Sequence, residues 1–200
     1  MAVSETQNVG RPRSFDEEAV LDALVALFWR KGYSQTSMTD IVDASGVHKP
    51  SLYRVFGTKD EIFAAVLRRY LAGQMNMLDQ LIDRTSPGTK GVHEFLDEFA
   101  AAALADAGRN GCLLVVASNE LSGTIAGYED FASSYRSVLR ERLTRLLSDK
   151  TRAGNDPTVE QRSELLTTFL AGFQVAVRAG APDEEINRIV DSMHAVIASW

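Results

Sequence analysis

Apolar residues recur at three- or four-residue spacing along most of the chain, and the first such stretch covers residues 15–31. Leu24 and Phe28 lie on one face of the helix that this spacing predicts, and acidic residues crowd its first turn. Ser14 is the expected amino-terminal cap, and Gly32 is expected to end the helix. The pattern therefore predicts an amphipathic helix here.

Two short helices are predicted next. Ser37 can cap the first of them, and Gly46 is expected to break it. Proline is tolerated only in the first turn of a helix, so Pro50 places the start of the second near Lys49. This helix is expected to run to Val55 or Phe56.

A Thr-x-x-Glu capping box at Thr58 and Glu61 begins a long fourth helix, which Pro87 and Gly88 end. Residues 113–116 form the clearest strand-like run, but no partner run or hairpin motif accompanies it. We therefore expect an all-α fold. Further helices are predicted near residues 90–107, 111–121, 128–152, 158–179 and 183–199.

The composition is that of an ordinary globular protein, with 45% apolar and 24% charged residues among 200. No apolar run approaches the ~18 residues that span a bilayer, so no membrane association is expected. Residues 1–10 are polar and small and show no apolar signal segment, which predicts a disordered tail and a cytoplasmic protein. Cys112 is the sole cysteine, which excludes an intrachain disulfide and a cysteine zinc cluster.

Charge is distributed unevenly along the chain. The whole chain carries a net charge of −6, whereas residues 30–59 carry five cations and two acids. A locally basic unit on an acidic body is compatible with nucleic-acid binding.

The three predicted helices within residues 15–56 suit a helix-turn-helix unit that turns at Gly46. Ile41 and Val47 can fix the angle between the two short helices, and the second of these can enter the major groove. Leu52 and Phe56 would face inward. The side chains expected to reach bases or phosphates are Thr36, Ser37, Thr39, His48, Lys49, Ser51, Tyr53, Arg54 and Lys59.

Taken alone, a helix, a glycine turn and a helix also fit an ordinary helical protein with solvated faces. An enzyme on a helical bundle is disfavoured, because no glycine-rich phosphate loop and no Gly-x-Ser-x-Gly elbow occurs. A helical adaptor that binds protein is opposed only by the amino-terminal sequence.

That amino-terminal sequence resembles the TetR family of transcriptional regulators over about residues 11–71. The resemblance is carried by RPRSFD at 11–16, FWRKGY at 28–33, TSMTDI at 36–41 and GVHKPSLYRVFGTKDEIF at 46–63. It implies a homodimer of about nine helices per subunit, whose first three bind a palindromic operator in double-stranded DNA. The implied function is that of a repressor released from DNA by a small-molecule effector, with no enzymatic activity and no cofactor.

The resemblance also assigns roles to single residues. Lys49, Pro50, Ser51, Tyr53 and Val55 fall where the family contacts its operator. Lys59 matches a phosphate-binding lysine, Thr39 lies where the second helix often reaches DNA, and Arg11 and Arg13 resemble basic arms. Val55 departs from the polar residue of some members, so only a contact with a thymine methyl group is expected there.

The implied domains are a disordered tail at 1–10, a helix-turn-helix DNA-binding domain at 11–57, and a helical ligand-binding and dimerisation domain at 58–200. Apolar faces of the last two predicted helices would form the dimer interface, although periodicity equally fits an intrachain core. The expected interface residues are Leu166, Phe169, Leu170, Phe173, Ile189, Val190, Met193 and Ile197.

A ligand pocket would combine apolar walls with a few polar groups. The candidate lining residues, each of which also fits plain core, are Phe95, Phe99, Cys112, Leu113, Tyr128, Phe131, Tyr135, Phe169 and Phe173. Cys112 follows Gly111 at a predicted helix start, where a lowered thiol pKa would make it a redox or electrophile sensor; an inert buried cysteine is the alternative. His93 suits either the pocket or the surface, and no histidine spacing forms a metal motif.

Overall fold

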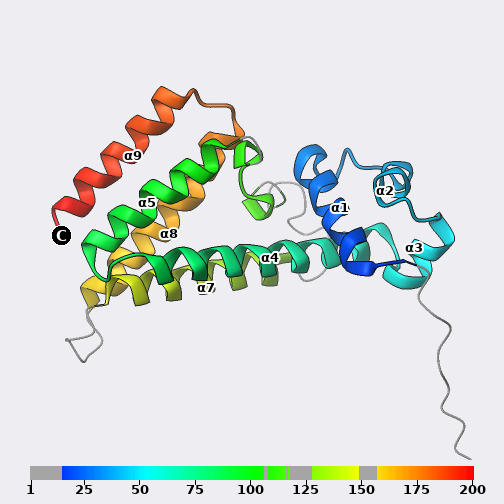
Figure 1. Ribbon diagram of the computed structural model, residues 1–200, viewed down its shortest axis with the longest axis horizontal. Coiled ribbons are helices and arrows are strands. Elements are labelled where there is room, and N and C mark those ends of the chain that lie inside the picture. Colours follow the sequence, from blue (N-terminus) through cyan, green and yellow to red (C-terminus); the bar gives the residue numbers. More distant parts are fainter. Residues whose placement is uncertain (1–14, 106–107, 116, 118–127, 149–156) are drawn as a thin grey trace, which may run out of the picture.

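The structure, a computed structural model, describes residues 15–105, 108–115, 117, 128–148 and 157–200, apart from the side chains of residues 128–130. Regular structure within these residues is entirely helical (Figure 1), which confirms the all-α prediction, and even the strand-like residues 113–115 are helical. The elements are α1 (Glu17–Lys31), α2 (Met38–Ser45), α3 (Lys49–Phe56), α4 (Lys59–Arg84), α5 (Thr89–Leu104), the 3-10 turn η1 (Gly108–Asn110), α7 (Tyr128–Leu147), α8 (Pro157–Arg178) and α9 (Asp183–Ala198).

Capping boxes begin α2 and α4, as predicted. In α2 the Ser37 hydroxyl accepts from the Asp40 backbone N–H at 3.2 Å, and the Asp40 carboxylate accepts from the Ser37 N–H at 2.7 Å. Thr58 and Glu61 make the reciprocal pair at the start of α4. Both helices therefore start where their sequences dictate.

The start of α1 differs from the prediction. Asp16, not Ser14, is the cap, and its carboxylate accepts backbone N–H bonds from the first turn at 3.0 and 3.2 Å. A carboxylate also complements the positive end of the helix dipole, which favours it over a neutral hydroxyl. Ser14 itself lies outside the described residues.

One apolar core joins α1, α2, α3 and the first half of α4. Phe28, Ile41, Leu52 and Phe63 are fully buried in it. The Phe28 and Phe63 rings meet edge to face with centroids 4.8 Å apart, a favourable aromatic geometry. This packing fixes the direction of α3 relative to α1 and α4.

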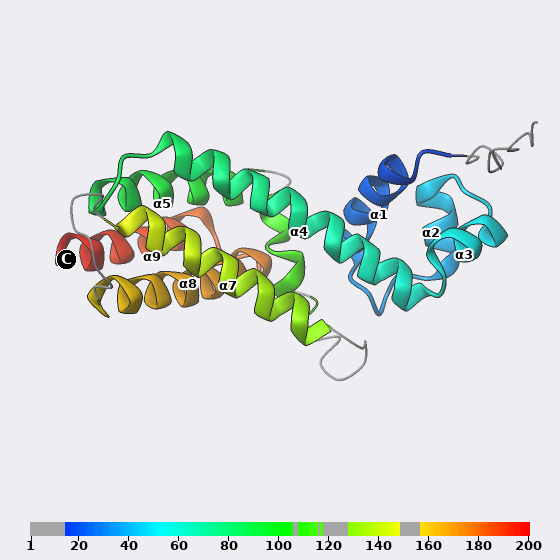
Figure 2. The ribbon, with the colours of Figure 1, turned by 90° about the horizontal axis from the view of Figure 1, so that it is seen from below.

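The long helix α4 belongs to both ends of the molecule. It leaves the α1–α3 end and runs into the helical body (Figure 2), where Leu78 and Ile82 join a second core. Arg69 of α4 makes a bidentate ion pair with Asp22 of α1 at 2.7 and 2.9 Å. The predicted domain boundary between residues 57 and 58 stays a prediction. Helix α4 follows this boundary and packs into the cores of both predicted domains.

The body consists of α5, α7, α8 and α9 together with the second half of α4. Phe95, Leu143, Phe173 and Ile186 bring four of these helices into one buried cluster. Figures 1 and 2 show α7 alongside α4, with α8 and α9 at the end remote from α3. None of the described helices is both long and apolar enough to cross a membrane.

The predicted dimer-interface residues need a correction. Six of them are at most 7% exposed within a single chain: Leu166, Leu170, Phe173, Val190, Met193 and Ile197. They belong to the core of the single chain. Side chains that are already buried have almost no surface left for a second subunit to cover. Phe169 and Ile189 are only partly buried, and their place in an interface stays a prediction.

Candidate functional site

Gly46 forms the turn between α2 and α3. Its φ and ψ of 64° and 11° lie in the left-handed region, which glycine adopts without steric penalty, and its N–H donates to the Val42 carbonyl at 2.9 Å. Ile41 and Val47 on either side of the turn are buried, as predicted. The turn and its two apolar anchors hold α2 and α3 as a helix-turn-helix pair.

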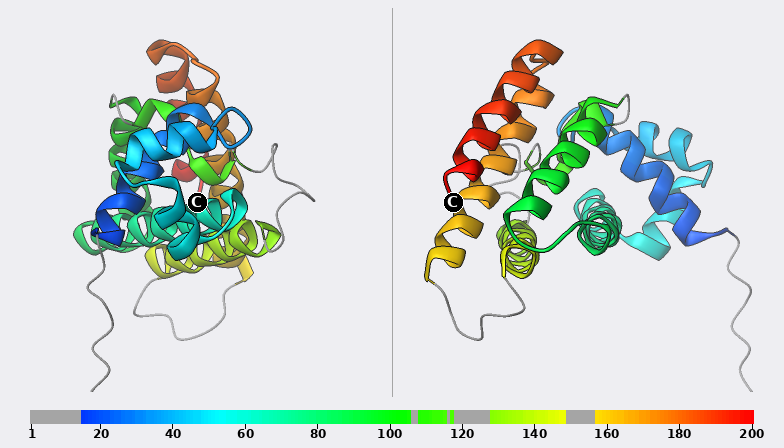
Figure 3. Two further views of the ribbon diagram at one scale, coloured as in Figure 1. Left: turned by 90° about the vertical axis from the view of Figure 1, so that its right-hand side faces the viewer. Right: turned by 60° about the vertical axis from the view of Figure 1, so that its left-hand side comes forward.

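Helix α3 lies at the outer end of the molecule (Figure 3, left), and most of its exposed side chains are polar. Its Leu52 is fully buried, whereas Lys49 and Arg54 are exposed and Tyr53 is 43% exposed. No ion pair links Lys49 or Arg54 to a carboxylate among the described residues. Two cations and a phenol are therefore available at one surface.

The amino end of α3 carries no negative charge and no side-chain cap. His48 occupies the cap position without a side-chain hydrogen bond, and the first turn carries no acidic residue. By contrast, α1, α2 and α4 each carry an acid in the first turn and a capping side chain. The positive end of the α3 dipole is consequently not neutralised by its own helix, which suits contact with phosphate.

Lys59 is positioned by an aromatic ring. Its ammonium lies 4.0 Å from the centroid of the Tyr33 ring, a cation–π geometry. The Tyr33 hydroxyl donates to the carboxylate of Asp60, and burial together with that carboxylate raises the Tyr33 pKa to about 12. Tyr33 thus stays neutral, joins the α1–α2 connection to the start of α4, and orients Lys59; the sequence analysis missed this role.

The predicted contacts around α2 divide into two groups. Thr36 is only 2% exposed, and its hydroxyl donates to the Gly32 carbonyl at 2.6 Å, so its assignment as a DNA contact is corrected to a structural one. Ser37 and Thr39 are exposed, although the Ser37 hydroxyl is engaged in the capping box. For Ser37 and Thr39 the DNA contact stays a prediction.

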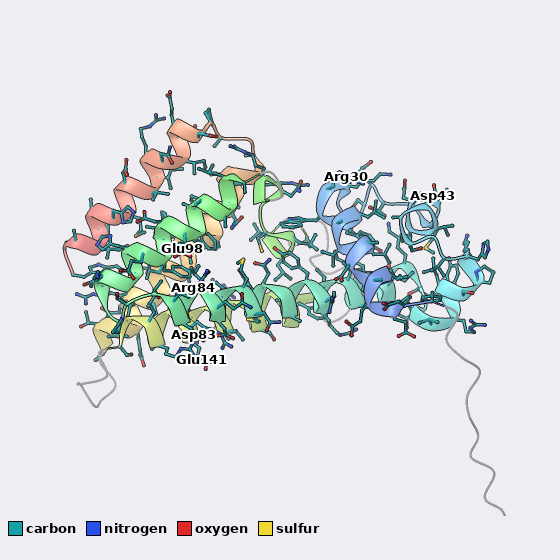
Figure 4. All side chains as sticks on the ribbon, in the orientation of Figure 1. Arg30, Asp43, Asp83, Arg84, Glu98 and Glu141 are labelled. Atoms are coloured by element: carbon teal, nitrogen blue, oxygen red, sulfur yellow. The ribbon has the colours of Figure 1, made fainter. Side chains whose placement is uncertain are left out.

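Two adjoining cavities of about 260 and 270 Å³ lie in the body. They share the lining residues Phe99, Cys112, Tyr135 and Gln174. The first is also lined by Arg84 of α4 and Glu98 of α5, which form an ion pair at 3.4 Å (Figure 4); the second reaches toward α7 and α8.

Phe99, Cys112 and Tyr135 were predicted pocket residues, and the structure brings them together at these cavities; their binding a ligand stays a prediction. The remaining candidates whose side chains the structure describes line neither cavity. Most of them are buried or half-buried core residues: Phe95, Leu113, Phe131, Phe169 and Phe173. The Tyr128 side chain lies outside the described residues.

The environment of Cys112 does not activate a thiolate. The side chain is 4% exposed, and burial raises the thiol pKa above its ordinary value. A thiol that stays protonated is a poor nucleophile, so the expectation of a lowered pKa at a helix start is corrected.

One hydrogen-bonded joint links the α1–α3 end to the cavities. The Trp29 indole N–H of α1 donates to the Gly111 carbonyl at 2.6 Å. Arg178 of α8 donates to the carbonyls of Trp29 and Asn110 at 2.9 and 3.1 Å. These partners lie 68 to 149 residues apart in the chain, so no local sequence pattern indicates them.

His93 lines neither cavity. Its Nδ1 lies 2.6 Å from Nδ1 of His194, and the second ring nitrogen of His194 lies 2.7 Å from the Asp97 carboxylate. The pair joins α5 to α9, so the structure favours a packing role over a pocket role for His93.

A glycine turn between two short helices, an acid-free amino end on the second helix and exposed cations beside it are together typical of a helix-turn-helix DNA-binding protein. Residues 20–66 match the family described as bacterial regulatory proteins, tetR family. The chain is 30% identical to the HTH-type transcriptional repressor ComR of Escherichia coli (strain K12), over 94% of each chain. It is 32% identical to the HTH-type transcriptional repressor BdcR of the same organism, over 53% of this chain and 54% of that one.

Solved structures agree with these relatives. A cysteine mutant of the TetR family transcriptional regulator CifR, complexed with 26-bp operator DNA, superposes with a TM-score of 0.75 at 26% identity, covering 95% of this chain and all of that one. A TetR family regulator from Cytophaga hutchinsonii, 18% identical over 98% of each chain, shares the fold with a TM-score of 0.78. This chain belongs to the TetR family and is a DNA-binding transcriptional regulator rather than an enzyme.

Proposed function

We propose that this protein represses transcription by binding a palindromic operator as a homodimer, and that a small molecule held in the body releases it. The acid-free amino end of α3, flanked by Lys49 and Tyr53, is the observation that carries the proposal. We also propose that it acts in the cytoplasm and that it uses no cofactor.

In the proposed complex α3 lies in the major groove. Lys49 and Arg54 donate to guanine edges or phosphates, while Ser51 and Tyr53 donate to phosphates. His48 and Pro50 approach the backbone at the start of the helix. Lys59 binds phosphate beside the first turn of α4.

The proposed dimer uses the outer sides of α8 and α9, at the end remote from α3. Leu165 and Val175 on α8 are 45% and 52% exposed, and Val196 on α9 is 39% exposed. Exposed apolar side chains on two neighbouring helices favour association with a second copy. The two α3 helices of the dimer, about 34 Å apart, would then enter successive major grooves on the same side of the DNA.

The test is a fluorescence anisotropy titration with the DNA that flanks the gene, compared with scrambled DNA of the same length. We expect tighter binding to the flanking DNA, with two chains per site by sedimentation. Tyr53→Phe should weaken binding by on the order of 1 kcal/mol, since one phosphate hydrogen bond is lost. Equal affinity for scrambled DNA would contradict the proposal.

A further inference from the structure

Gln174 of α8 carries a buried acceptor without a partner. No hydrogen-bond donor among the described residues reaches its Oε1, and this atom is shielded from solvent. Leaving a buried amide oxygen unpaired is costly, so such atoms call for a missing partner. Gln174 lines both cavities of the body, so its unpaired acceptor lies beside the wall that they share.

The neighbouring polar groups do not supply that partner. The Tyr70 hydroxyl accepts the Leu113 N–H at 3.2 Å, and no described donor, that of Tyr135 included, reaches the Gln174 acceptor. Most of the other residues that line the second cavity are apolar, Phe99 and Leu170 among them. The surroundings of Gln174 in this cavity are therefore largely apolar.

The shared wall also disfavours negative charge. Burial raises the pKa of the Cys112 thiol and of the Tyr135 phenol, so both stay neutral. A carboxylate placed among them would lose its hydration in the same way. The charged residues Arg84 and Glu98 of the first cavity are paired with one another, and Arg136, the cation that lines the second cavity, is exposed to solvent.

We propose that the two adjoining cavities hold one neutral, mainly apolar molecule whose single hydroxyl or N–H donor bonds to Gln174 Oε1. This inference rests on the proposed function and names the chemical class of its effector. Each cavity lies somewhat below the ~300–1,000 Å³ of common ligand pockets, and the pair together reaches that range.

The test uses three probes of similar ring size in calorimetric titrations of the full chain: 2-naphthol, 2-methoxynaphthalene and 2-naphthoate. We expect 2-naphthol to bind about tenfold more tightly than 2-methoxynaphthalene, which lacks the donor. The anionic 2-naphthoate should bind more weakly than both.

Gln174→Met removes the acceptor and keeps the length of the side chain. Its preference for 2-naphthol over the methyl ether should disappear, while the melting temperature of the free protein should rise, because the unpaired oxygen is gone. Gln161→Met, on the exposed side of the same helix, serves as the matched control and should retain the preference.

Operator binding is measured on the same preparations. Protein that binds DNA but shows no preference for 2-naphthol, or a Gln174→Met variant that keeps the preference, overturns the ligand assignment and leaves the proposed function standing. Protein that binds 2-naphthol but no operator overturns the proposed function instead.

Discussion

The indole N–H of Trp29 donates to the carbonyl of Gly111, 2.6 Å away, and thereby ties α1 to the wall of the first cavity. Trp29 and Gly111 both line the first cavity, beside Cys112. Because α1 packs against α2 and α4 in the same core, a shift of this joint would reorient the helix-turn-helix unit.

Trp29→Phe should weaken the response to ligand. A smaller aromatic ring replaces the indole and the bond to Gly111 is lost, which removes about 1 kcal/mol of interaction at the joint. We expect operator affinity of the free protein to stay within about threefold, and the ligand concentration that releases DNA to rise about fivefold, as measured by anisotropy.

Trp200→Phe is the matched control, since Trp200 stacks with Arg162 at the far end of the body. A normal release curve for Trp29→Phe, with its fold intact by circular dichroism, would contradict a role for this joint in coupling.

Asp40→Asn should lower stability at neutral pH. The Lys31 ammonium, and then hydrogen bonds from Ser37, hold the pKa of the Asp40 carboxyl well below its ordinary value. A carboxyl with a depressed folded-state pKa contributes stability above the unfolded pKa of about 3.9, and this is lost as the pH falls toward the folded value. The difference in melting temperature between wild type and Asp40→Asn should therefore close as the pH is lowered below about 4.

Asp43→Asn, at an exposed position of the same helix (Figure 4), provides the control. A melting difference for Asp40→Asn that persists unchanged at pH 2 would show that the charge of this carboxylate is not its source.

Gly46→Ala and Gly73→Ala should have opposite effects. Gly46 has φ 64°, and a Cβ there would meet no atom, so the cost of about 1 kcal/mol comes from the left-handed backbone alone. Gly73 lies inside α4 with open space around it, so alanine should stabilise by about 0.5–1 kcal/mol. Urea unfolding at one protein concentration measures both; equal effects would refute this view of the turn.

Local chemistry made much of the DNA-binding end predictable. The capping boxes at Ser37 and Thr58 and the turn at Gly46 each depend on neighbours within four residues, so sequence spacing determines them. Thr36 was misjudged because its burial depends on how the connection after α1 folds back onto the Gly32 carbonyl.

The body was less predictable, because its contacts join distant segments. The periodicity of α8 and α9 was read correctly as an apolar face, but period alone does not tell which chain covers that face. The orphan oxygen of Gln174 and the joint between Trp29 and Gly111 arise only when several helices meet. Neither has a sequence motif.

The central claim, that α3 and the start of α4 clamp DNA, is tested most directly by the salt dependence of operator binding for Lys59→Ala. Losing one phosphate contact should weaken binding by on the order of 1 kcal/mol, and make the slope of log K against log salt shallower by about one unit. Lys90→Ala on α5, which breaks only an exposed pair with Glu94, should leave affinity and slope unchanged. Unchanged affinity and slope for Lys59→Ala would contradict the docking proposed for this protein.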